Sequence, residues 1–113
     1  MGLPLRKSKV ELPATCPLVD ALAMLRGAWA PNVIWSLSAG PRRFGELRTD
    51  LPGISARILS KRLRELETQG IVTRQQMDTS PPTAQYALSE LGSEFLPVIR
   101  ELAAVGRKLR QLK

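Results

Sequence analysis

The chain has 113 residues, a length that suits one domain with a single hydrophobic core. Hydrophobic residues make up 43% of it and aromatic residues only 4%, so the core must consist mainly of Leu, Ile, Val and Ala. Seventeen Lys and Arg residues against ten Asp and Glu give a formal net charge of +7. Such a balance is typical of a nucleic-acid-binding domain, although it also occurs in proteins whose charge only maintains solubility.

The absence of histidine and the presence of a single cysteine, Cys16, exclude several function classes. Cys/His zinc sites and Ser-His or Cys-His nucleophilic arrangements need residues that this chain lacks, so we expect no metal, no cofactor and no enzymatic activity. One cysteine cannot form an internal disulfide, which fits a reducing cytosol. No apolar run approaches a membrane span of about 20 residues, and the N-terminus lacks the apolar segment of a signal peptide. We therefore expect a cytoplasmic protein.

The N-terminal part of the chain predicts an arm followed by two helices. Residues 1–14 contain two prolines and three basic side chains, so we expect a flexible basic arm there and the domain itself over residues 15–113. The first helix begins at Pro17, which suits a first turn because it lacks an N–H, and runs toward Gly27. A second helix begins at Pro31 and stops at the Ala-Gly-Pro sequence of residues 39–41.

The middle of the chain has the pattern of a helix-turn-helix. Phe44 and Leu47 mark a short third helix, which ends before a Leu-Pro-Gly turn at residues 51–53. Ser55 then has the position of an N-cap for a fourth helix over residues 56–69, and Gly70 supplies its C-terminal stop. In DNA-binding proteins, this order of a short helix, a tight turn and a longer helix places the longer helix in the major groove.

The remaining residues predict a β-hairpin and a last helix. Residues 71–77 and 83–88 have strand character and flank a Ser-Pro-Pro turn, which predicts a hairpin in the position of a wing. Ser89 caps a final helix that extends to the C-terminus, and Pro97 is expected to kink this helix or shift its start. The predicted fold is therefore mainly α with a small β-hairpin, a winged helix-turn-helix.

The fourth helix is amphipathic, and its polar side is the candidate DNA-binding surface. At 3.6 residues per turn, Leu59, Leu63 and Leu66 fall on one face. The opposite face carries basic and hydroxyl side chains, which are the groups that contact base edges and phosphates. With the N-cap included, the candidates for base edges are Ser55, Arg57, Ser60, Lys61 and Arg64. The candidates for phosphates are Arg42, Arg43 and Arg48 near the turn, and Thr68 near the helix end.

A run of motifs between Cys16 and about Gly106 resembles the HxlR-type winged helix-turn-helix transcriptional regulators. The matching segments are CP at 16–17, RGAW at 26–29, GPRRFGELR at 40–48, LPGIS at 51–55, Leu59, LRELE at 63–67, GIV at 70–72 with Arg74, PP at 81–82 and YALSELG at 86–92. They cover most of the chain in order, which makes the resemblance specific.

This resemblance implies a homodimer that binds inverted-repeat operators in double-stranded DNA and regulates transcription. Its first and last helices would form a dimerisation layer, with interface candidates Leu18, Leu22, Phe95, Ile99, Leu102 and Leu109. The last helix carries more apolar surface than a small domain needs, although a helix packed wholly on its own domain is the alternative. A dimer has a physical advantage, because two recognition helices roughly 34 Å apart match successive major grooves.

The chain departs from the family pattern at three places. Ala28 replaces the usual lysine, Val105 stands where tryptophan is common, and residues 83–85 replace a basic residue and a Val-Glu pair in the wing. We therefore expect a less aromatic dimer interface and a smaller contribution of the wing to DNA binding.

Two questions remain open at the level of the sequence. Cys16 is either a small buried residue at the dimer interface or a thiol that senses oxidants or electrophiles, since a helix N-terminus favours thiolate. The basic face has an alternative use in a winged-helix protein–protein interaction module that binds an acidic partner. The residues identify no small-molecule or oxidant effector.

Overall fold

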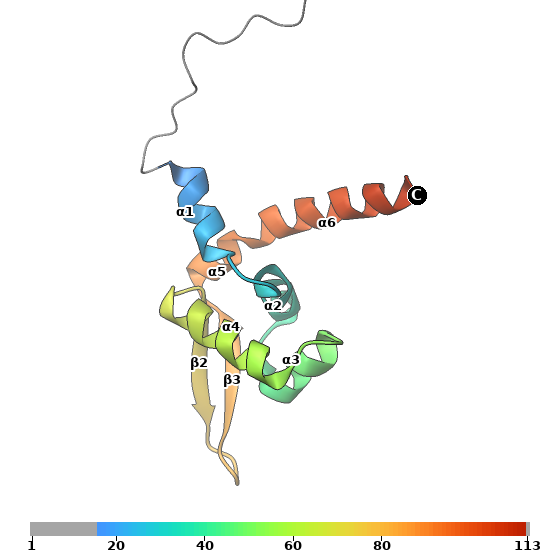
Figure 1. The fold of residues 1–113 in the computed structure, drawn as a ribbon. Helices are drawn as coiled ribbons and strands as arrows, with labels where there is room; N and C mark the ends of the chain where they lie inside the picture. The colour runs from blue at the N-terminus through green and yellow to red at the C-terminus, as the bar shows by residue number, and fades with distance from the viewer. Residues whose placement is uncertain (1–15, 113) are drawn as a thin grey trace, which may run out of the picture.

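The computed structural model describes residues 16–112, so the arm predicted at residues 1–14 lies outside the described residues. Two helices come first, α1 (Pro17–Met24) and α2 (Ala30–Ser36), followed by the 3-10 turn η1 (Leu37–Ala39). The helix-turn-helix consists of α3 (Phe44–Asp50) and α4 (Ala56–Thr68). Two further helices, α5 (Glu90–Glu94) and α6 (Leu96–Gln111), end the described chain (Figure 1). None of the helices in residues 16–112 is long and apolar enough to cross a membrane.

A three-stranded antiparallel sheet lies beside the helix-turn-helix. Its order is β1 (Arg42–Arg43), β3 (Thr83–Leu88) and β2 (Val72–Met77), so β3 is the central strand. The pairing of β2 with β3 runs from Val72 opposite Leu88 to Met77 opposite Thr83, which confirms the predicted hairpin. The third strand was not predicted, because two residues are too short to show an alternating pattern.

The core is formed by the apolar sides of α2, α3 and α4, closed by the start of β2 and of α6. Leu59, Leu63 and Leu66 of α4 are all buried, as the helical spacing predicted. They share one cluster with Ile34 of α2 and Leu47 of α3. The mainly helical winged-helix fold expected from the sequence is therefore confirmed.

The last predicted helix is two helices rather than one. Phe95 ends α5, and Pro97 lies in the first turn of α6, where its missing N–H leaves no hydrogen bond unmade. Ser89 caps α5 as expected, since its Oγ accepts a hydrogen bond of 3.0 Å from the Gly92 N–H. Gly92 is required by close packing, because a Cβ at this position would overlap the carbonyl oxygen of Ile71.

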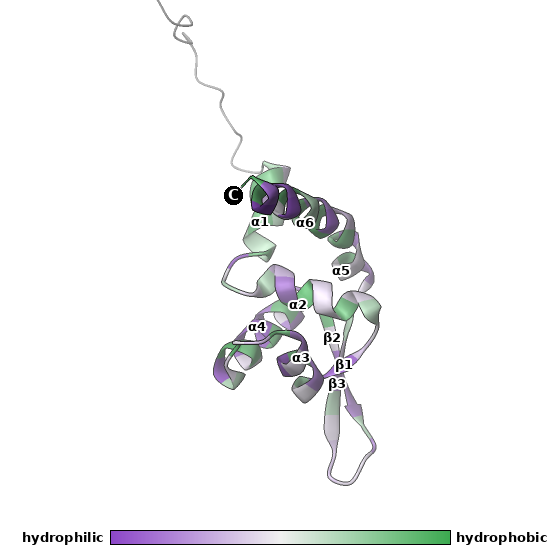
Figure 2. Ribbon diagram, turned by 90° about the vertical axis from the view of Figure 1, so that its right-hand side faces the viewer, coloured by the Kyte–Doolittle hydropathy of each residue, from purple (hydrophilic) through white to green (hydrophobic). Residues whose placement is uncertain are grey.

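The elements are arranged along the length of the molecule. The helices α1 and α6 lie at one end, and the tip of the β2–β3 hairpin lies at the opposite end, with α2, α3 and α4 between them (Figures 1 and 2). The helix α6 extends away from the rest of the domain. This arrangement separates the surface of α6 from that of α4.

Candidate nucleic-acid interface

The start of α4 is fixed by the predicted N-cap. Ser55 has extended backbone angles, φ −79° and ψ 155°, and its Oγ accepts a hydrogen bond of 3.1 Å from the Ile58 N–H. Such a cap satisfies one of the donors that every helix leaves unpaired at its N-terminus. The Ser55 hydroxyl can still donate to a ligand, because a hydroxyl both accepts and donates.

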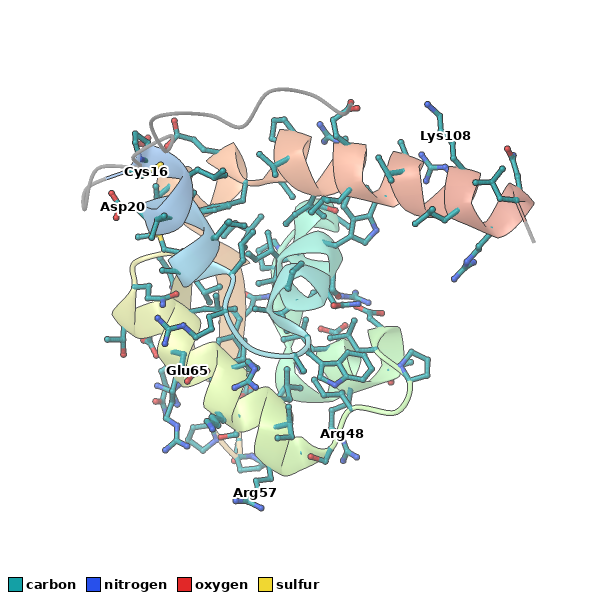
Figure 3. The ribbon with its side chains drawn as sticks, turned by 45° about the horizontal axis from the view of Figure 1, so that its top comes forward. Cys16, Asp20, Arg48, Arg57, Glu65 and Lys108 are labelled. Atoms are coloured by element: carbon teal, nitrogen blue, oxygen red, sulfur yellow. The ribbon has the colours of Figure 1, made fainter. Side chains whose placement is uncertain are left out.

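The polar side of α4 is exposed and unpaired. The candidates for DNA contact on this side are Arg57, Ser60, Lys61, Arg64 and Thr68. Within the part of the chain that the structure describes, none of these side chains forms an ion pair or a side-chain hydrogen bond. Figure 3 shows Arg57 projecting from α4 away from the rest of the domain. The donors of this face are therefore available to another molecule, and they come from a helix whose opposite side is held by the core.

The arginines around α3 do not form one group. The guanidinium of Arg42 makes two hydrogen bonds to the Asp50 carboxylate, from Nε at 2.9 Å and from Nη2 at 2.7 Å. Ser36 also donates to this carboxylate, at 2.6 Å, so Asp50 joins α2, β1 and α3. Hydrogen bonding from Arg42 and from Ser36 lowers the pKa of Asp50, and the same contact with Asp50 raises the pKa of Arg42.

The role predicted for Arg42 as a phosphate ligand stays a prediction, and the structure shows that this side chain already has a partner. Its guanidinium is already paired within the domain, and this pairing fixes β1 against α3. Arg43 and Arg48 are exposed and form no ion pair with the acidic residues that the structure describes. They are the phosphate candidates next to α4 whose side chains have no acidic partner among the described residues.

The wing brings little positive charge to its tip. No basic residue lies between Met77 and Thr83, and the loop carries Asp78. The hydroxyl of Thr79 donates to the Pro81 carbonyl oxygen at 2.7 Å and lies 3.1 Å from the Thr83 hydroxyl, so the loop polar groups bond to one another. This agrees with the expectation of a small wing contribution.

The six interface candidates divide into two groups. Leu18 and Leu22 of α1 and Leu102 and Leu109 of α6 are between 56% and 63% exposed. Phe95 and Ile99, in contrast, are only 8% and 6% exposed and belong to the core of their own domain. Little of either side chain is left for a dimer interface, so the interface predicted from the sequence depends on the four exposed leucines.

An apolar stripe continues along α6 beyond the two leucines. Its members recur every three or four residues, so they lie on one side of the helix. They are Val98, Leu102, Val105, Leu109 and Leu112, all more than half exposed. We call this set the α6 stripe.

Cys16 lies at the N-terminus of α1 and is the free cysteine of the chain. Its side chain is 8% exposed, and it does not cap the helix through a side-chain hydrogen bond. In Figure 3 it lies far from Arg57. Burial favours the packing interpretation over the sensing one.

The fold and the exposed basic face of α4 define a winged-helix regulator of transcription. The profile of the HxlR-like helix-turn-helix proteins matches residues 24–113, and the chain belongs to this family. It is 36% identical over 92 residues to the HTH-type transcriptional regulator YkvN of Bacillus subtilis, covering 81% of this chain and 78% of YkvN. A second relative from Bacillus subtilis, YdeP, is 35% identical over 95 residues, which are 84% of this chain and 74% of YdeP.

Solved structures agree with this assignment. The reduced form of the redox regulator HypR superposes with a TM-score of 0.79 at 32% identity, covering 85% of this chain and 95% of HypR. The reduced form of the transcriptional regulator YodB from Bacillus subtilis gives 0.69 at 35% identity, covering 78% and 86%. The relatives and neighbours are named as transcription regulators, a class without enzymatic activity, so the chain is a regulator and not an enzyme.

Proposed function

We propose that this chain binds a specific inverted-repeat sequence in duplex DNA as a homodimer. The observation that carries the proposal is the exposed and unpaired polar face of α4, which follows a short helix and a tight turn. In this arrangement α4 enters the major groove, and the β2–β3 hairpin lies over the flanking DNA.

The side chains divide by the group that they contact. Ser55, Arg57, Ser60, Lys61 and Arg64 lie toward the N-terminal and middle turns of α4 and contact base edges. Arg43, Arg48 and Thr68 lie at the borders of this surface and contact phosphates, which fixes the register of the protein on the duplex. Arg and Lys are suited to guanine, because its O6 and N7 atoms accept two hydrogen bonds in the major groove.

Dimerisation uses the other end of the molecule. Exposed apolar surface is unfavourable in water, and both α1 and the α6 stripe present it. A twofold axis through these helices places two copies of α4 on one side of the dimer, and a separation of about 34 Å matches one turn of DNA.

The domain limits of 15–113 and the cytoplasmic location stay predictions.

The test is binding of the purified protein to duplex DNA from the region that flanks its own gene. Fluorescence anisotropy with excess non-specific competitor is measured at about 50 mM and about 200 mM salt. We expect binding that resists the competitor and weakens steeply at the higher salt, because bound phosphates release their counterions. Binding of an acidic protein with no sequence preference for any DNA would instead support a protein–protein interaction module.

A further inference from the structure

The loop between α1 and α2, residues 25–29, has an unusual backbone. Gly27 has φ 96° and Trp29 has φ 78°, and Trp29 is the one non-glycine residue with a positive φ among residues 16–112. A large side chain adopts this conformation only where its surroundings fix it. The loop is therefore held in one shape by its contacts.

Those contacts come from α4 and from the turn before it. The Arg62 Nε donates a hydrogen bond of 2.6 Å to the Ala28 carbonyl oxygen, and its Nη1 is 2.9 Å from the Glu65 carboxylate. The Arg62 side chain is only 11% exposed. Gly27 leaves the space that it needs, since a Cβ there would lie 2.7 Å from the Arg62 Cζ.

A second contact joins the same loop to the turn between α3 and α4. The ring of Trp29 lies beside Gly53, where a Cβ would be 3.9 Å from its Cη2 atom. The loop therefore touches the recognition helix at two places, at its second turn through Arg62 and just before its start through Trp29.

Other contacts between α1 and α4 are few. None of the eight residues of α1 is buried within the described chain. A cavity of about 480 Å³ separates the end of α1 from α4, and it is lined by Ala23, Met24, Arg26, Lys61, Arg62 and Glu65 among others. Met24 and Leu25 at the end of α1 pack against the core that also contains the α4 leucines. The hydrogen bond from Arg62 to Ala28 adds a direct polar contact between α4 and the loop that follows α1.

We propose that Arg62 is a positioning residue that fixes the recognition helix α4 relative to the dimerisation helix α1. This inference rests on the proposed function, since it matters only in a dimer that binds two half-sites. In such a dimer α1 packs on the partner, so the contact from Arg62 to Ala28 sets the distance and angle between the two copies of α4. Arg62 thereby determines which half-site spacing the protein accepts.

The test compares Arg62→Met with Arg64→Met on an operator selected from random duplexes. Both changes remove one arginine from α4, but Arg64 lies on the exposed polar face. The operator is also made with one base pair inserted or deleted between its half-sites, which rotates them by about 35°. We expect the wild-type protein to lose on the order of tenfold in affinity on the altered spacings.

Arg62→Met is expected to bind operators of the original and the altered half-site spacing almost equally, with affinities that differ by less than about threefold. Arg64→Met should weaken binding to all spacings alike and keep the discrimination. Arg62→Lys should restore part of it, because lysine still has a donor for the Ala28 carbonyl oxygen. If Arg62→Met keeps the wild-type preference, the inference is wrong; if the wild-type protein shows no sequence-specific binding, the proposed function fails as well.

A distance measurement covers the case in which Arg62→Met does not fold. Glu65→Ala removes the ion pair and the hydrogen bond that orient the Arg62 guanidinium, and because Glu65 is exposed the domain should remain folded. A spin label is attached at Glu67→Cys in a Cys16→Ser background, and the label-to-label distance across the dimer is measured with and without Glu65→Ala. We expect a broader distribution with Glu65→Ala, because Arg62 is then held less firmly against Ala28, and an unchanged width would overturn the inference.

Discussion

The helices α4 and α6 are both amphipathic, but the structure uses their two sides in opposite ways. In α4 the apolar residues Leu59, Leu63 and Leu66 are buried, and the candidate side chains of the polar side face outward and form no ion pair within residues 16–112. In α6 only Ile99 is buried, and the α6 stripe is exposed over the whole length of the helix. The same kind of helix therefore offers a polar surface in one place and an apolar surface in the other.

The two surfaces require different partners. Burying a leucine side chain contributes about 1.5–3 kcal/mol, so an exposed stripe of this length has a strong tendency to associate with another apolar surface. The polar side of α4 gains nothing from such burial and instead suits an anionic partner with acceptor groups. A dimer bound to DNA satisfies both requirements, and each prediction below changes one of the two surfaces or the contacts that support them.

The largest effect is expected from Leu102→Glu, in the middle of the α6 stripe. A carboxylate there would have to be buried without a partner in the dimer, so the protein should become a folded monomer. Affinity for the full operator should fall about 100-fold or more, because the second half-site no longer binds intramolecularly. Sedimentation velocity and anisotropy measure both changes. Gln111→Glu, on the opposite side of α6, introduces the same charge and should keep the dimer; a dimeric Leu102→Glu protein would refute the interface.

A smaller effect is expected from Arg57→Ala and from Lys61→Ala on the polar side of α4. Each should cost about 1–3 kcal/mol of binding free energy if it contacts a base edge, and should relax sequence preference at one position of the operator. The fold should be unaffected, because both side chains are exposed. Competition anisotropy with single-base operator variants measures the effect, and Arg107→Ala on α6 is the control. Full affinity after both changes together would exclude α4 as the recognition helix.

A modest effect on stability is expected from Asp50→Asn, which weakens the contact that supports α3. Hydrogen bonding from Arg42 holds the pKa of Asp50 below its ordinary value of 3.8 in the folded protein. Its stabilising contribution is therefore complete well above that value and is lost as the pH falls through the lowered pKa.

Urea unfolding near neutral pH and at about pH 3 tests this expectation. The wild-type protein should be more stable than Asp50→Asn at neutral pH, and the difference should shrink in acid. A difference that stays constant over this range would show that the ionised Asp50 carboxylate does not stabilise the fold.

The smallest effect is expected at Cys16. Because its side chain is 8% exposed, we expect diamide to leave operator affinity unchanged within about twofold, both in the wild-type protein and in Cys16→Ser. A loss of affinity that requires Cys16 would establish the sensing interpretation in place of the packing one.

The sequence predicted those features that depend on local patterns. The leucine spacing of α4, the Ser55 cap, the two wing strands and the break near Pro97 each follow from a few neighbouring residues. The exposure of the polar side of α4 follows from the same spacing, because its opposite side must be buried. The fold and the candidate surface could therefore be predicted together.

Features that depend on contacts distant in the sequence could not be predicted in this way. Arg62 carries no local signal that its guanidinium turns toward Ala28, 34 residues earlier. In the sequence Arg42 is one of several basic residues near the turn. Only the folded chain shows that its guanidinium is hydrogen-bonded to the Asp50 carboxylate. Phe95 has the helical spacing of an interface residue, but in the folded chain it belongs to the core cluster together with Ile71 and Val72.

The most direct test of the central claim is selection of binding sites from a pool of random duplex DNA. The purified protein is bound to the pool at moderate salt, and the retained duplexes are sequenced over several rounds. We predict enrichment of one inverted repeat, with half-site centres about one helical turn, roughly 34 Å, apart. Enrichment should be absent with the Arg57→Ala, Lys61→Ala double variant. A wild-type pool that shows no enriched sequence, or a single half-site without a repeat, would contradict a dimeric regulator that recognises DNA through α4.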